Sequence, residues 1–145
     1  MNVVIVEDEL PAAEQMRGFV NAYQAPITIW GMYSTCEEIK KYLDNNNHID
    51  VVFCDVELRD GNALDALRQI ELKTVIVFTT AYDQFWNESL QHNGVDYLLK
   101  PITLQKVHQA LDKVITLKRI FTKDNLLLKE LSGLIQQKFD QPYKE

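Results

Sequence analysis

Polar side chains that could perform chemistry stand directly after short apolar runs at four places in this 145-residue sequence. The groups concerned are Glu7-Asp8-Glu9, Asp55, Thr79-Thr80 and Lys100. One polar ending is ordinary, because loops are polar, but four endings of complementary type are much less expected by chance. Carboxylates, hydroxyls and an ammonium group are the side chains that together hold a divalent cation and a phosphoryl group. Whether they meet depends on the elements that carry them.

Short β-branched and apolar runs alternate with longer helical patterns along the chain. The expected strands cover residues 3–6, 27–33, 51–54, 75–79 and 95–99. Helices are expected over residues 12–23, over 63–72 after an Asp60-Gly61 turn, and over 83–91 before an Asn93-Gly94 turn. Another helix is expected to begin at a Ser34/Glu37 capping box. The last helix is expected to be capped by Thr103 and to carry Leu104, Val107, Leu111, Val114 and Ile115. This alternation predicts an α/β fold, a doubly wound parallel sheet with helices on both faces.

The charges at the strand ends indicate what they could bind, because the carboxyl ends of parallel strands meet at one edge of the sheet. Three carboxylates (Glu7, Asp8 and Asp55) would face one ammonium group, that of Lys100. Two like charges about 4 Å apart repel by about 4 kcal/mol at an effective dielectric constant of about 20. The cluster must therefore take up a proton or a divalent cation, and oxygen ligands without nearby Cys or His favour magnesium over zinc.

Asp55 is the candidate nucleophile, because it ends an apolar run that has no other charge. A carboxylate beside a magnesium ion can attack phosphorus and form an aspartyl phosphate. Lys100 and the Thr80 hydroxyl would then contact the phosphoryl oxygens.

Composition excludes several other classes of protein. With 21 acidic and 15 basic side chains the net charge is −6, which argues against direct nucleic-acid or anionic-membrane binding by this chain. The length fits one domain, and no apolar run approaches the roughly 18 residues of a membrane span. Cys36 and Cys54 lie in apolar surroundings and are expected to be reduced packing residues. A cytoplasmic protein is the expectation.

Taken together, the motifs resemble the receiver domain of two-component response regulators. The matching pieces, in the family's order and spacing, are Val4-Ile5-Val6-Glu7-Asp8-Glu9, Phe53-Cys54-Asp55, Thr80-Ala81 and Asp96-Tyr97-Leu98-Leu99-Lys100-Pro101. The resemblance implies a flavodoxin-like, five-stranded parallel sheet of order 2-1-3-4-5. The short Leu58-Arg59-Asp60-Gly61 connection looks like receivers of LytTR-type transcription regulators, whereas many other receivers have proline where Arg59 stands.

The resemblance also implies roles for the acidic residues. Asp55 matches the residue that accepts a phosphoryl group from a sensor histidine kinase. Glu7, Asp8, Asp55 and the backbone carbonyl of Glu57 match the ligands of a magnesium ion. The chain is then no enzyme in the ordinary sense, but a phosphoacceptor that assists its own phosphorylation and dephosphorylation.

The remaining matches concern switching. Thr80 and Tyr97 match the family's switch residues, Lys100 matches its site lysine, and the Lys100–Pro101 peptide bond is expected to be cis. Simpler interpretations stay open beside these. Glu7 to Glu9 could be an acidic first helical turn, Thr80 a helix cap, Tyr97 a packing aromatic and Lys100 a surface lysine.

Residues 1–120 are expected to form the receiver, and residues 121–145 a helical linker or tail. In the LytTR-type subgroup a DNA-binding domain, absent from this chain, would follow. Apolar residues recur every seven positions into the tail, but the companion positions do not, so a linker and a dimer contact stay open. A homodimer could form through the fourth helix, the fifth strand, the last helix or the tail.

Two other functions stay open: a magnesium-dependent phosphatase or phosphotransferase with an aspartyl phosphate, and a phosphorylation-independent dimerisation module.

Overall fold

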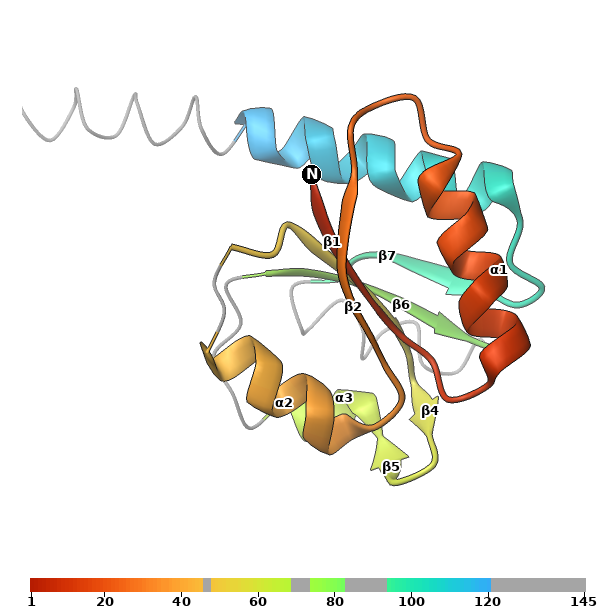
Figure 1. Ribbon diagram of the computed structural model, residues 1–145, viewed down its shortest axis with the longest axis vertical. Helices are drawn as coiled ribbons and strands as arrows, with labels where there is room; N and C mark the ends of the chain where they lie inside the picture. Colours follow the sequence, from red (N-terminus) through yellow and green to blue (C-terminus); the bar gives the residue numbers. More distant parts are fainter. Residues whose placement is uncertain (46–47, 69–73, 83–93, 121–145) are drawn as a thin grey trace, which may run out of the picture. The chain divides into compact units, whose positions relative to one another are not determined.

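The computed structural model describes residues 1–45, 48–68, 74–82 and 94–120 (Figure 1). Four predicted segments lie wholly or partly outside these residues. They are the helix over 83–91, the turn at 93–94, the end of the helix over 63–72 and the tail over 121–145. The chain separates into two compact units, Met1–Val114 and one that begins at Ile115. The domain boundary expected after residue 120 stays a prediction.

Five parallel strands form the central sheet of the first unit. They are, in spatial order, β2 (Thr28–Tyr33), β1 (Asn2–Val6), β3 (Val51–Asp55), β6 (Val75–Thr80) and β7 (Gly94–Leu99). Every neighbouring pair is parallel. Counting these five strands alone, the order is the predicted 2-1-3-4-5. All residues of β3 are buried, as expected for a central strand covered on both faces.

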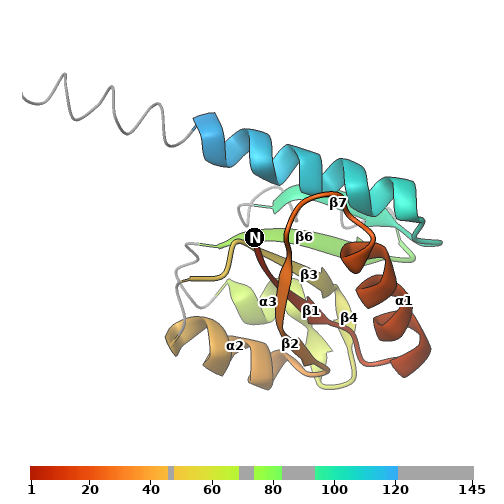
Figure 2. The same cartoon turned by 45° about the horizontal axis from the view of Figure 1, so that its top comes forward.

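Helices cover both faces of this sheet, as predicted (Figures 1 and 2). On one face α1 (Leu10–Asn21) packs together with a helix that begins at residue 104, and Met16 and Val20 share a core with Val107 and Leu111. On the other face lie α2 (Cys36–Asn45) and α3 (Ala63–Leu67). Leu104, in the first turn of that helix, is 44% exposed.

The caps of two helices were predicted, one of them in the wrong register. The Ser34/Glu37 capping box is wrong, because α2 begins at Cys36 and Thr35 is the residue before it. The Thr35 Oγ1 accepts from the Glu38 amide at 3.1 Å, and the Glu38 carboxylate accepts from the Ser34 amide at 3.3 Å. The cap at Thr103 is confirmed, since its Oγ1 accepts from the amide of Lys106 at 3.2 Å.

A small hairpin follows β3. The sequence predicted only a turn in this segment, and no strands. Its arms are β4 (Glu57–Leu58) and β5 (Gly61–Asn62), with Glu57 paired to Asn62 and Leu58 paired to Gly61. Arg59 and Asp60 therefore form its tip. Gly61 has φ +144°, a conformation that side-chain-bearing residues rarely adopt.

Replacing Asn62 with alanine is expected to lower the free energy of unfolding by about 1 kcal/mol. The Asn62 side chain caps α3, accepting from the amides of Leu64 at 2.8 Å and Asp65 at 3.3 Å. Urea denaturation measures the loss. Asn62→Asp keeps the acceptor and should stay close to the unchanged protein, so an equal loss in both variants would contradict the capping role.

Candidate functional site

The predicted site residues come from the carboxyl ends of neighbouring strands. Glu7 and Asp8 follow β1, Asp55 ends β3 and Lys100 follows β7. Carboxylate oxygens of Glu7, Asp8 and Asp55 all lie within 4.8 Å of one another. The side chains that the sequence placed at three strand ends are thus brought together.

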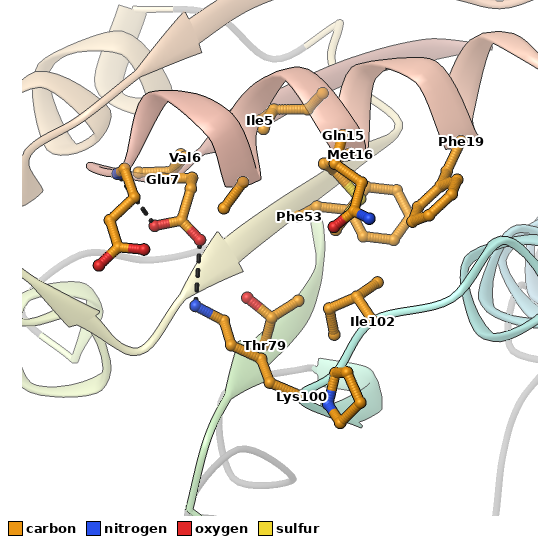
Figure 3. A pocket seen from close by; sticks show the side chains of 13 residues that line it. Ile5, Val6, Glu7, Gln15, Met16, Phe19, Phe53, Thr79, Lys100 and Ile102 are labelled. Carbon is orange, nitrogen blue, oxygen red and sulfur yellow. Dashed lines mark hydrogen bonds and ion pairs between the residues drawn. The ribbon is translucent and has the colours of Figure 1, made fainter.

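Lys100 joins two of these carboxylates. Its Nζ lies 2.9 Å from Oδ2 of Asp55 and 3.1 Å from Oε1 of Glu7, the second contact being visible in Figure 3. Burial lowers the pKa of Lys100, but the hydrogen bonds and charges of Asp55 and Glu7 outweigh it and leave that pKa raised. The side chain is therefore a firmly protonated ammonium, fixed between two acids.

The raised pKa of Glu7 shows that the single ammonium of Lys100 does not neutralise the acidic cluster. Burial first, and then the charge of Asp55, raise the pKa of Glu7 from 4.5 to about 7, although Lys100 acts in the opposite direction. Three convergent carboxylates that cannot all be neutralised by one lysine fit a hard divalent cation such as Mg²⁺, which prefers oxygen ligands. The donor set thus suits the magnesium ion implied by the sequence.

The Asp55 carboxylate is oriented through both of its oxygens. Oδ1 accepts from the Glu57 amide at 3.0 Å, and Oδ2 faces Lys100. The backbone behind it is also fixed, because the Val56 amide donates to the Thr79 carbonyl at 2.9 Å. Asp55 is only 6% exposed, so little of its surface is open to a reactant.

Thr80 and Tyr97 are connected through a third residue, Tyr82. The buried Thr80 hydroxyl accepts from the Tyr82 amide at 3.1 Å, and the Tyr97 hydroxyl donates to the Tyr82 carbonyl. Tyr97 is also part of the core on the α2 and α3 face, so it packs as well as bonding. Lys100 reaches the same segment, since its amide donates to the Thr80 carbonyl at 2.8 Å.

The turn after β7 is fixed by a residue that sequence reasoning missed. The Lys100–Pro101 peptide bond is cis. Lys106, from the helix that follows, donates from Nζ to the carbonyls of Leu99 at 2.9 Å and Pro101 at 3.0 Å. The only sequence signal was a lysine in the first turn of a helix that starts just after the site lysine.

A cavity of about 210 Å³ opens beside the ion pair. Figure 3 shows Glu7 and Lys100 at one end of it, and Met16, Phe19 and Phe53 toward the other. It lies between α1 and the strand ends, and its lining is largely apolar away from the charges. No sequence pattern indicated this cavity.

A known protein family covers most of this chain. Residues 3–112 match the family described as the response regulator receiver domain.

The chain belongs to the response regulator receiver family.

This receiver is similar to named regulators. It is 31% identical over 116 residues to the sensory transduction protein LytT of Enterococcus faecalis, covering 78% of the chain and 47% of that protein. It is 27% identical over 146 residues to the transcriptional regulatory protein LytR of Staphylococcus aureus, covering 97% of the chain and 56% of that protein. The chain thus spans about half the length of these curated relatives.

Solved receivers share the fold. The response regulatory domain of protein mrkE from Klebsiella pneumoniae superposes with a TM-score of 0.71 at 28% identity, over 80% of this chain and 96% of that one. A response regulator receiver domain from Clostridium thermocellum, at 21% identity and a TM-score of 0.68, supports the fold alone. Both results agree with the five-stranded parallel sheet described above.

Membership of the family makes this chain a phosphoryl-accepting signalling domain of a two-component system and not an ordinary enzyme. In the part of the chain that the structure describes, no helix has the length and apolar character needed to cross a membrane.

Proposed function

We propose that this receiver accepts a phosphoryl group on Asp55 from the phosphohistidine of a sensor kinase, in a magnesium-dependent reaction. One observation carries the proposal: the Asp55 carboxylate is held by Lys100 and the Glu57 amide, within 4.8 Å of the Glu7 and Asp8 carboxylates. A structural acid at a strand end would not need two further acids at that distance.

In the proposed step an Asp55 carboxylate oxygen attacks phosphorus, and an acyl phosphate bond forms. The phosphorus–nitrogen bond of a protonated phosphohistidine breaks, and neutral imidazole leaves with the electron pair. Lys100 moves its ammonium contact from the carboxylate to the phosphoryl oxygens, where negative charge accumulates. Glu7, Asp8, Asp55 and the Glu57 carbonyl would hold Mg²⁺, which when bound supplies charge neutralisation for the transferring group.

We further propose that Thr80 and Tyr97 transmit the change. A phosphoryl group on Asp55 offers new acceptors to the Thr80 hydroxyl, which would turn it away from the Tyr82 amide. Because Tyr97 donates to the carbonyl of the same residue, its hydroxyl would lose its present partner when that segment moves. The result is a shift between two populated states of the surface around β7.

The output proposed for the whole regulator is transcription in the cytoplasm. Residues 1–120 act as the receiver, and residues 121–145 link it to a DNA-binding domain of the LytTR type, with the receiver itself making no nucleic-acid contact. Phosphorylation would act by homodimerisation through the β7 side or the tail. The names of the LytT and LytR relatives support this assignment.

Incubation with acetyl phosphate and Mg²⁺, followed by intact-mass measurement, tests the proposal. We expect one phosphoryl adduct on the unchanged receiver, and none after chelation of the metal or in Asp55→Ala. No adduct on the unchanged receiver, or an equal adduct on Asp55→Ala, would defeat the assignment. Many turnovers of a metabolite phosphate would instead favour a phosphatase.

A further inference from the structure

The tip of the β4–β5 hairpin contacts two other parts of the receiver. On one side, the Arg59 guanidinium donates to the backbone carbonyl of Asp8 at 3.4 Å. On the other side, the Asp60 carboxylate accepts from the amide of Cys36 at 2.8 Å and from that of Glu37 at 3.2 Å. The two tip residues thus attach the hairpin to the acidic cluster and to the start of α2.

The two amides that Asp60 contacts, those of Cys36 and Glu37, lie in the first turn of α2 and have no hydrogen-bond acceptor within the helix. The first amides of a helix have no partner within the helix, and the positive end of its dipole attracts a carboxylate. The hydrogen bond from the Cys36 amide is the main reason that the pKa of Asp60 lies below its ordinary value. Asp60 is therefore a charged cap that α2 receives from a segment 24 residues away in sequence.

The other end of the same hairpin lies at the phosphorylation site. The Glu57 amide donates to Asp55 Oδ1, and Glu57 pairs with Asn62 across the hairpin. Leu58 is buried and pairs with Gly61, so a turn of only two residues separates the arms. In so short and closely paired a hairpin, the position of Asp60 constrains that of the Glu57 backbone.

We propose that Asp60 is a positioning residue for the phosphorylation site. By attaching the hairpin to the N-terminus of α2, it holds the Glu57 backbone where its amide orients Asp55 and its carbonyl completes the magnesium site. This inference rests on the proposed function of that site. It adds a residue outside the acidic cluster, and it makes α2 part of the support of the phosphoacceptor.

A purely structural role for Asp60 can be separated from this one, because α2 has a second cap. Thr35 accepts from the Glu38 amide at the same end of the helix, but it does not belong to the hairpin. Thr35→Ala and Asp60→Ala each remove one cap from α2, and only Asp60→Ala also detaches the hairpin tip from α2. The two variants therefore lose the same kind of helix cap, and they differ only in whether the hairpin stays attached to α2.

The test uses Mg²⁺ titration by calorimetry, urea unfolding without metal, and amide hydrogen exchange of Glu57 in the metal-free protein. We expect Asp60→Ala to weaken Mg²⁺ binding by roughly tenfold, because it removes a residue that supports a metal ligand. Thr35→Ala should leave the affinity unchanged at a similar loss of stability. Asp60→Asn, which keeps one acceptor oxygen, should restore most of the affinity. Exchange at Glu57 should rise in Asp60→Ala alone.

The outcomes are decisive in each direction. Equal affinity losses in Asp60→Ala and Thr35→Ala would reduce Asp60 to a helix cap, and an unchanged affinity in Asp60→Ala would also overturn the proposal. If the unchanged receiver binds no Mg²⁺, the proposed function fails. Exchange at Glu57 then decides separately whether Asp60 holds the hairpin, and equal exchange in both variants would refute it.

Discussion

Replacing Lys100 with methionine is expected to slow phosphoryl uptake from acetyl phosphate by at least about a hundredfold, while Mg²⁺ binds no more weakly than before. The ammonium lies 2.9 Å from Asp55 and 3.1 Å from Glu7, so it is placed to meet the charge of the transferring group. Its removal leaves three carboxylates with no described cation between them, which favours metal binding. Rate and affinity should therefore move in different directions.

A second lysine provides the control for this experiment. Lys113 forms an ion pair with Asp96 at 3.2 Å, and its side chain is more than half exposed. Lys113→Met removes the same charge and is expected to change neither the rate nor the Mg²⁺ affinity. If Lys100→Met lost rate and affinity together, the lysine would be organising the cluster and not acting on the phosphoryl group.

Asp55→Asn is expected to raise the free energy of unfolding of the metal-free receiver by about 1 to 2 kcal/mol while it abolishes phosphorylation. The Asp55 charge is one cause of the raised pKa of Glu7, so the two carboxylates oppose each other when no cation is present. Asparagine keeps an oxygen for the Glu57 amide. The gain should be largest above pH 7, where Glu7, with its pKa of about 7, is ionised.

Urea unfolding with and without Mg²⁺ measures this effect. Mg²⁺ should stabilise the unchanged receiver by mass action and stabilise Asp55→Asn much less, because one ligand charge is gone. Asp44→Asn removes a charge from an exposed position of α2, and its effect should stay within about 0.5 kcal/mol. A destabilised Asp55→Asn, or one indistinguishable from Asp44→Asn, would show that repulsion in the cluster is small.

The strands and the convergence of the side chains at their ends could be predicted, because their signals are local or follow from topology. The run Val51 to Cys54 has no polar residue, which predicts a strand buried on both faces, and β3 is such a strand. Once the sheet is parallel, Glu7, Asp55 and Lys100 must end at one edge. No contact between distant side chains had to be foreseen for either conclusion.

The parts that could not be predicted depend on a side chain finding backbone groups of another element. Asp60 meets the amides of Cys36 and Glu37, and Lys106 meets two carbonyls of the turn after β7. Nothing in the spacing of these residues indicates the partner. The register of the α2 cap was wrong for a related reason, since Ser34 and Thr35 both suit a cap and the start of the helix decides between them.

The state of the two native thiols has a practical consequence for following the proposed phosphorylation. Cys36 and Cys54 are buried and free, and burial is the main cause that raises the pKa of Cys36 to about 11 and that of Cys54 well above its usual value. Neither thiol is therefore a good nucleophile toward maleimide dyes near neutral pH. A fluorophore could be attached selectively through Tyr82→Cys, because the native Tyr82 is 49% exposed and its peptide groups bond to both Thr80 and Tyr97. Its emission would report on phosphoryl arrival in real time, with both native cysteines left in place.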